Sequence, residues 1–86
     1  MMKLIRTERF LRDYKKPPPA VRKQADRKLL YLAQDITHPS LRVKRVRKYK
    51  HVYEGRINMD FRFLFQITTD GYILLRIGRH DILERA

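Results

Sequence analysis

Residues 7–34 carry their apolar side chains at the spacing of α-helices. Phe10, Leu11 and Tyr14 fall on one side of a short helix, which Thr7 can cap. The prolines at positions 17–19 end this helix, because a residue that precedes proline avoids helical geometry. A second helix is predicted from about Ala20 to Gln34, with the apolar stripe Val21, Ala25, Leu29, Leu32 and Ala33.

The pattern changes from helical to alternating at Leu41. Three apolar stretches, at residues 52–57, 61–68 and 72–77, alternate as strands of a half-buried sheet do, and residues 3–6 are a further short strand. No linker interrupts the chain, so residues 1–86 are predicted to form one domain. Because the helices precede a meander of neighbouring strands, its class is α+β, with two N-terminal helices packed on an antiparallel sheet.

The pairing of the strands follows from the side chains that need burial, since a slip of one residue turns every side chain over. With residues 58–60 as a three-residue loop, Gly55 pairs with Phe63 on an apolar face that meets the helices. On the opposite face Arg56 lies directly across from Arg62. Two like charges side by side cost stability unless an anion covers them or the side chains splay into solvent.

The second hairpin offers two registers around the turn signal Asp70–Gly71. A two-residue turn pairs Phe65 with Arg76 and buries a charge. A three-residue loop, with Gly71 in the left-handed conformation, pairs Phe65 with Leu75 and is favoured because it buries apolar side chains. The favoured register also pairs Phe63 with Ile77 and Ile67 with Ile73, and it gathers Glu54, Arg56, Arg62, Leu74, Arg76, Gly78 and His80 on one face.

Composition adds a strong positive charge to this picture. The 86 residues carry a formal net charge of +12, and 43% of them are hydrophobic, enough for a compact core. Repulsion between so many like charges lowers stability, and a folded protein tolerates it when it binds a negative partner. The candidate partners are RNA, DNA, an anionic membrane and an acidic protein, and RNA is favoured. The alternative is a basic domain that has no anionic partner. Cysteine is absent and no apolar run reaches the ~20 residues of a membrane span, so the cytoplasm is the expected compartment.

Basic residues are concentrated between positions 42 and 50. Such a cluster binds phosphates whatever the base sequence, and lysines on an edge strand also discourage pairing with another sheet. Both explanations hold together here. The predicted RNA- or ribosome-binding residues of this run are Arg42, Lys44, Arg45, Arg47, Lys48 and Lys50.

Arginines beside a histidine suit chemistry at a phosphodiester. Guanidinium groups bind its non-bridging oxygens, and His80 can give a proton to a leaving 5′-oxygen or take one from a 2′-hydroxyl. The alternative for His80 is an exposed histidine at a strand end. Glu54 is either a second proton-transfer group or a counter-ion that orients Arg56. No metal or other cofactor is predicted, because the three histidines, at positions 38, 51 and 80, lack the spacing of metal ligands.

Four segments of the chain resemble the RelE/ParE superfamily of toxins from toxin–antitoxin systems. They are HPSLRVK at 38–44, VYEGRI at 52–57, DFR at 60–62 and IGRHDIL at 77–83. The resemblance implies a RelE-like fold of two helices on a twisted antiparallel sheet of about four strands. It also implies a type II antitoxin that masks the basic face and carries the complex to its operator DNA. Its RelE-type members cleave mRNA in the ribosomal A site, near the 16S rRNA, by activating the 2′-hydroxyl without metal.

The resemblance implies roles for single residues. Arg56 and Arg62 match basic residues that act at the phosphate, and His80 matches a position held by arginine or histidine. Glu54 departs from the family, because RelE itself has lysine there. Together with the register, the resemblance predicts Arg56, Arg62, His80 and Glu54 as catalytic, and it adds Asp60, Arg76 and Arg79 to Lys44 and the other RNA- or ribosome-binding residues.

Two other functions remain open. A ParE-like toxin shares the fold but inhibits DNA gyrase, and His80 with the Arg56–Arg62 pair argues against it. A nucleic-acid-binding member without activity is favoured slightly by the C-terminal sequence, because no aromatic residue stands there to stack on a base. Within the resemblance, an mRNA endoribonuclease is therefore the leading expectation.

Overall fold

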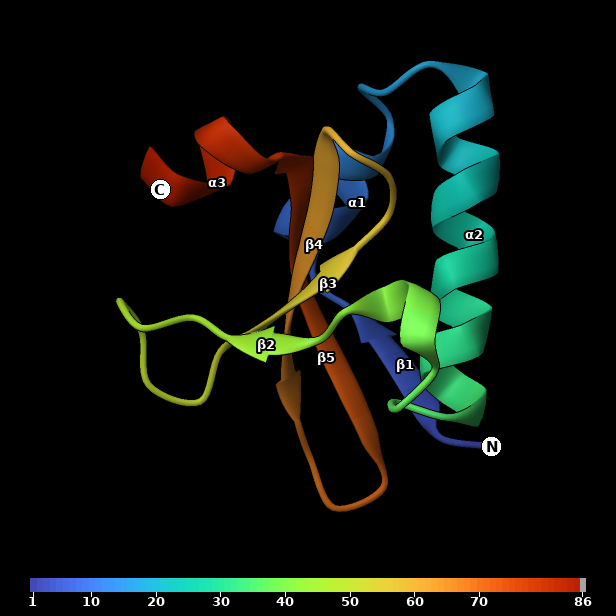
Figure 1. The fold of residues 1–86 in the computed structure, drawn as a ribbon, viewed down its shortest axis with the longest axis vertical. Coiled ribbons are helices and arrows are strands. Elements are labelled where there is room, and N and C mark those ends of the chain that lie inside the picture. Colours follow the sequence, from blue (N-terminus) through green and yellow to red (C-terminus); the bar gives the residue numbers. More distant parts are fainter. Residues whose placement is uncertain (86) are drawn as a thin grey trace.

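A single five-stranded sheet organises the chain, and the two N-terminal helices pack on one of its faces (Figure 1). The computed structural model describes residues 1–85, with residues 82, 84 and 85 described by their backbone alone. The strands lie in the order β1-β5-β4-β3-β2. In chain order the elements are β1 (Lys3–Arg6), α1 (Glu8–Tyr14), α2 (Pro19–Gln34), the 3₁₀ helix η1 (Pro39–Leu41), β2 (Lys44–Arg45), β3 (Tyr53–Arg56), β4 (Phe61–Ile67), β5 (Gly71–Arg79) and α3 (His80–Arg85).

Both predicted N-terminal helices are confirmed. The Thr7 hydroxyl accepts a hydrogen bond from the Phe10 N–H at 3.1 Å and so caps α1. Helix α2 begins at Pro19, where the missing N–H of proline costs nothing. The predicted stripe is buried at Ala25, Leu29, Leu32 and Ala33, and the first three pack in the main core with residues of the central strands.

The sheet differs from the antiparallel prediction at its edge. Strand β1 is present, as expected from residues 3–6, but it runs parallel to β5, with Lys3 paired to Gly71 and Arg6 to Leu74. A side chain at Gly71 would collide with the Lys3 carbonyl. Gly71 is therefore required for close approach of two strands, and its φ is not positive, so the predicted left-handed conformation is wrong.

The β3–β4 hairpin has the predicted register. Gly55 pairs with Phe63, and Arg56 lies across from Arg62. The ring of Phe63 fills the space that a side chain on Gly55 would need. The three-residue loop at 58–60 thus sets the face on which each arginine lies.

The β4–β5 hairpin follows the predicted register only near its open end. Phe63 pairs with Ile77 as expected, but Phe65 pairs with Leu74 instead of Leu75, because a β-bulge shifts the register between Leu64 and Phe65. Leu74 is fully buried, so its predicted place on the arginine face is wrong. The extra residue in β5 lets both Leu74 and Ile77 face the main core. The other predicted pair is also replaced, since Ile67 pairs with Tyr72 and Ile73 with Gln66.

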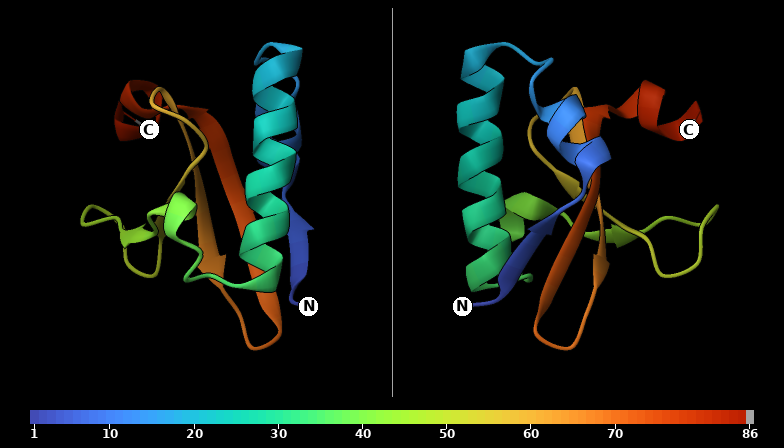
Figure 2. Two further views of the ribbon diagram at one scale, coloured as in Figure 1. Left: turned by 45° about the vertical axis from the view of Figure 1, so that its right-hand side comes forward. Right: turned by 180° about the vertical axis from the view of Figure 1, so that it is seen from behind.

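A small second core lies on the sheet face opposite α2. Val52, Leu64 and Leu83 are buried there, with Leu75 and Val46 packed against them. Leu83 belongs to α3, a helix that the alternating pattern did not predict. Figure 2 shows α3 and the loop at residues 46–52 on the side of the sheet away from α2.

Candidate nucleic-acid interface

Side chains from β2, β3, β4 and the residue that caps η1 surround one open pocket on the sheet face opposite α2. Its volume is about 260 Å³. Four of its side chains are cationic and one is a carboxylate, so the pocket suits an anion. The lining residues are Arg42, Lys44, Glu54, Arg56 and Arg62, all of which the sequence had put forward.

Glu54 lies between two of these cations. Its Oε1 is 3.4 Å from Arg62 Nε and 3.9 Å from Lys44 Nζ. Only about a fifth of the Glu54 side chain is exposed. Of the two roles predicted for it, this geometry favours the counter-ion, although its cation partners are Arg62 and Lys44, and not Arg56.

Arg62 is largely occupied by its own hairpin. Its Nη1 donates to the backbone oxygens of Asn58, of Met59 at 3.2 Å and of Phe61 at 2.9 Å. The side chain is 15% exposed. Arg62 thereby satisfies carbonyl groups of the β3–β4 loop, which is a structural task that the strand pattern did not reveal.

Arg56 has a different environment, although it is paired with Arg62 across the strands. It is half-buried, and its side chain has no ion pair or hydrogen bond with the side chains and backbone that the structure describes. Burial and the charges of Arg27 and Arg56 lower the pKa of Lys28, a half-buried residue of α2. Arg56 therefore lies near enough to α2 for its charge to act on Lys28.

His80 stands apart from this pocket. It is the first residue of α3, its side chain is exposed, and it does not line the pocket. Its backbone N–H donates to the Asp60 carbonyl at 3.0 Å. Gly78, two residues earlier, pairs with Arg62, so the backbone carries His80 to the end of the sheet beyond the arginine pair.

The basic run is mostly a loop. Only Lys44 and Arg45 form strand β2, which pairs with β3. The remaining basic residues of the run have exposed side chains, and Lys48 Nζ lies 5.6 Å from the centre of the Tyr49 ring. Exposed cations on a loop can contact successive phosphates of a polyanion. The exposed basic residues of this run outside β2 are Arg42, Arg47, Lys48 and Lys50.

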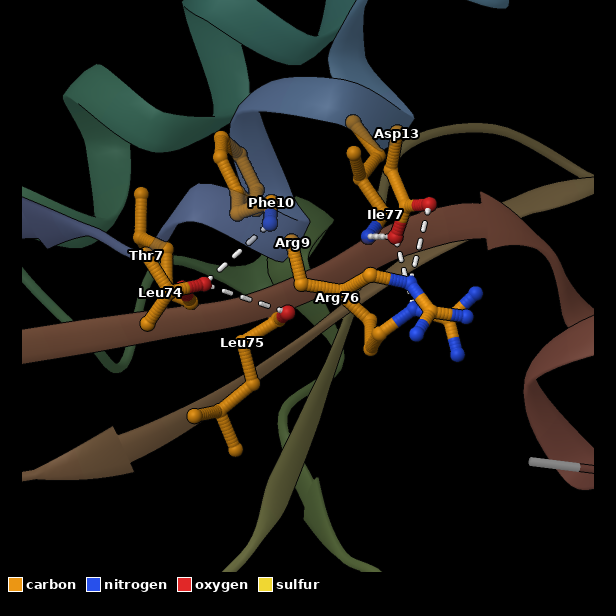
Figure 3. A network of polar contacts seen from close by, with 8 residues as sticks. All are labelled: Thr7, Arg9, Phe10, Asp13, Leu74, Leu75, Arg76 and Ile77. Carbon is orange, nitrogen blue, oxygen red and sulfur yellow. Dashed lines mark hydrogen bonds and ion pairs between the residues drawn. The ribbon is translucent and has the colours of Figure 1, made fainter.

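Arg76 is on the predicted sheet face but is not part of the pocket. Its Nε donates to Asp13 Oδ2 at 2.7 Å, and Asp13 is 3% exposed (Figure 3). The same oxygen accepts a hydrogen bond from Ile77 N at 3.2 Å, and Arg9 Nε lies 3.8 Å from Asp13 Oδ1. Arg76 is therefore held by α1. Asp13 lies three residues after the buried Phe10 and therefore on the same side of α1. This spacing was the one feature of the sequence that could have predicted the burial of Asp13.

The last predicted binding residues, Arg79 and Asp60, are exposed at the same end of the sheet as His80. The guanidinium carbon of Arg79 lies 5.5 Å from the centre of the Phe61 ring, a cation–π contact. Among the described residues, no three histidine, aspartate or glutamate side chains gather to hold a metal ion. Within the same residues, no helix is both long and apolar enough to cross a membrane.

Among known proteins, similarity to this chain was found only with solved structures. No protein-family model matches the chain, and no curated protein matches it significantly. The RelE-containing RelB–RelE antitoxin–toxin complex from Methanococcus jannaschii is similar over 94% of this chain and 95% of that one, with a TM-score of 0.76 and 17% identity. A copper-bound mutant toxin from Helicobacter pylori has a TM-score of 0.76 and 24% identity, covering 96% of this chain and 99% of that one.

A further similar structure is a YoeB–YefM complex from Staphylococcus aureus. Its TM-score is 0.75 at 13% identity, over 93% of this chain and 98% of that one. Near-complete coverage of both chains shows that the fold is shared over its whole length. The chain therefore has a RelE-like fold, as the sequence resemblance implied.

Proposed function

We propose that this protein is the toxin of a type II toxin–antitoxin system and that it inhibits translation by cleaving mRNA on the ribosome. The observation that carries the proposal is the anion-binding pocket, where Lys44 and three arginines outnumber the single carboxylate of Glu54. The shared fold adds support, since similar structures are toxins described with their antitoxins.

The proposed reaction is an attack of the 2′-oxygen of the RNA on the adjacent phosphorus. The 2′-hydroxyl loses its proton to water, a 2′,3′-cyclic phosphate forms and the bond to the 5′-oxygen breaks. Arg56 would bind the non-bridging oxygens, where negative charge builds up in the transition state. His80 would protonate the departing 5′-oxygen, because histidine exchanges protons near neutral pH. The chemistry needs no metal.

The geometry suggests how the RNA lies. Its reacting phosphate would sit between the pocket and the start of α3, where the exposed His80 ends the face that carries Arg56. The exposed cations at 42–50, with Asp60 and Arg79 at the far end, would contact the neighbouring nucleotides and the 16S rRNA. Glu54 would keep Lys44 in place and leave Arg56 to the substrate.

The partner proteins follow from the same proposal. A cognate antitoxin would mask the basic face, as the net charge of +12 favours an acidic segment. The similar RelB–RelE structure is an antitoxin–toxin complex, and a YoeB–YefM structure from Staphylococcus aureus is a toxin–antitoxin complex. The toxin–antitoxin complex would bind its own operator DNA through the antitoxin.

The decisive experiment is cleavage of an mRNA that programmes purified ribosomes. The wild type should cut within codons, and Arg56→Ala and His80→Ala should each slow cleavage at least ~100-fold, as loss of a charge-stabilising or acid–base group does. Both side chains lie off the core, so urea midpoints should stay near the wild-type value. Lys23→Ala, which removes an exposed charge from α2, is the matched control and should cleave normally.

The same experiment separates the rival functions. Growth arrest through gyrase-dependent DNA breaks, with translation continuing in a purified system, would overturn the proposal in favour of a ParE-like toxin. RNA binding without any cleavage, on or off the ribosome, would instead indicate an inactive nucleic-acid-binding member.

A further inference from the structure

Arg42 has a backbone conformation that arginine seldom adopts. Its φ is 46° and its ψ is 48°, which is the left-handed region, and it caps the C-terminal end of η1. Glycine or asparagine is usual at this kind of position, because a β-carbon crowds the following carbonyl oxygen. An arginine here lowers the stability of the fold relative to glycine.

Among the described residues, no side-chain ion pair or hydrogen bond of Arg42 compensates for this strain. The side chain of Arg42 is exposed, and it has no ion pair or hydrogen bond with any residue that the structure describes. What the conformation does achieve is placement, because Arg42 lines the anion pocket beside Arg56 and Lys44. Strained residues of this kind concentrate at ligand sites, where position is worth more than stability.

Within the described residues, only Arg56 of the two strand arginines that line the pocket has a free guanidinium, so Arg42 would supply the second. The side chain of Arg62 is bound to Glu54 and to carbonyl groups of its own loop. Arg56 alone among the strand arginines of the pocket has a side chain without such partners in the described chain. A phosphate is held well by two guanidinium groups, since each offers paired donors.

We propose that Arg42 is the second phosphate-binding residue of the pocket and that its strained backbone is retained to aim it at RNA. Arg42 and Arg56 form the phosphate clamp, whereas Arg62 is a positioning residue that holds the β3–β4 loop. The inference rests on the proposed function for its ligand, an RNA phosphodiester. Its geometric basis, the left-handed arginine in an anion pocket, is independent of the cleavage chemistry.

Arg42→Gly tests the inference, because it relieves the backbone and removes the guanidinium in one change. His51→Gly is the matched control, since His51 is the other described non-glycine residue with positive φ, at 61°, and it does not line the pocket. Arg42→Lys keeps the charge but loses the paired donors. Each variant is compared with the wild type in three measurements.

The measurements are the urea midpoint, the cleavage rate on programmed ribosomes, and the salt dependence of binding to a single-stranded 2′-O-methyl RNA that cannot be cleaved. Arg42→Gly should unfold at a midpoint equal to or above that of the wild type, yet cleave at least ~10-fold more slowly. Its plot of log affinity against log salt should be shallower by about 0.7, the loss of one phosphate contact. Arg42→Lys should keep the slope and cleave at an intermediate rate, and His51→Gly should gain stability without losing cleavage or slope.

Unchanged cleavage and slope in Arg42→Gly would overturn the inference, and so would a lower urea midpoint, because the side chain would then serve the fold. If the wild type does not cleave mRNA at all, the proposed function fails. The salt slope then still decides whether Arg42 contacts phosphate.

Discussion

The hydrogen bonds of Asp13 make a sharp prediction about stability. Strand β1 pairs with β5 only as far as Leu74, so the next part of this edge of β5 has no strand beside it. Asp13 Oδ2 takes that place, accepting from Ile77 N at 3.2 Å and from Arg76 Nε at 2.7 Å. With 3% of its surface exposed, water cannot substitute for the carboxylate.

The magnitude follows from what each substitution leaves behind. Asp13→Asn keeps an oxygen for Ile77 N–H but loses the charge that Arg76 needs, and a hydrogen bond to a charged group contributes ~1.5–3 kcal/mol. We therefore expect the free energy of unfolding to fall by about 2 kcal/mol. In a domain of this size that lowers Tm by about 8–16 °C. Asp13→Ala also strands the buried N–H and the guanidinium, and should cost about 4 kcal/mol.

Urea denaturation followed by circular dichroism measures these losses. Asp26→Asn is the matched control, because this exposed carboxylate accepts a hydrogen bond from Tyr14 and water can replace it, so less than ~1 kcal/mol should be lost. A double-mutant cycle with Arg76→Met isolates the pair. The reasoning fails if Asp13→Asn lies within ~0.5 kcal/mol of the wild type, since a buried ion pair cannot be lost so cheaply.

Three further predictions concern other contacts. Arg62→Ala should lower the free energy of unfolding by about 2 kcal/mol in urea, because loop carbonyl groups lose their donor; an unchanged value would show that water replaces it. Gly55→Ala should cost about 1–3 kcal/mol by displacing the Phe63 ring, measured as a lower Tm; a neutral result would mean that the ring has room to move. The hydrogen bond to Asp26, together with burial, raises the pKa of Tyr14, so its neutral form is favoured in the folded state. The stability advantage of the wild type over Tyr14→Phe should therefore be constant below about pH 10 and disappear as pH rises through the raised pKa, and urea midpoints that keep the same difference at about pH 8 and about pH 11 would contradict this.

The elements that the sequence predicted well are those governed by local rules. Helix α2 follows from its stripe of apolar residues, since the period of a helix is set by its own backbone. The Arg56–Arg62 pairing follows from a three-residue loop and a face that must be apolar. Both depend on neighbours within a few residues along the chain.

The errors arose where a distant element decides the outcome. Leu75 is the extra residue of the β5 bulge. The bulge lets the residues around it pack in the main core on one face and lets Leu75 pack against the second core on the other. Parts of both cores come from elements outside the β4–β5 hairpin, so the hairpin sequence does not reveal the bulge. The parallel pairing of β1 joins residues that are far apart in sequence, Lys3 and Gly71. Helix α3 follows directly after β5. The alternating pattern of β5 did not predict where the strand ends, whereas in the fold α3 contributes Leu83 to the second core.

The sequence by itself determined the two N-terminal helices, the β3–β4 hairpin and the sheet face on which Arg56 and Arg62 lie, because these depend on side-chain period and loop length. Only the tertiary structure decided which arginines are available to a ligand. Asp13 holds Arg76 from another element, and Glu54 and the loop carbonyl groups occupy Arg62. Arg42 reaches the pocket through a left-handed turn. A guanidinium group is available to a ligand only if packing brings no acceptor within ~3 Å of it. The acceptors come from other elements of the fold, so the periodicity of a strand does not predict them.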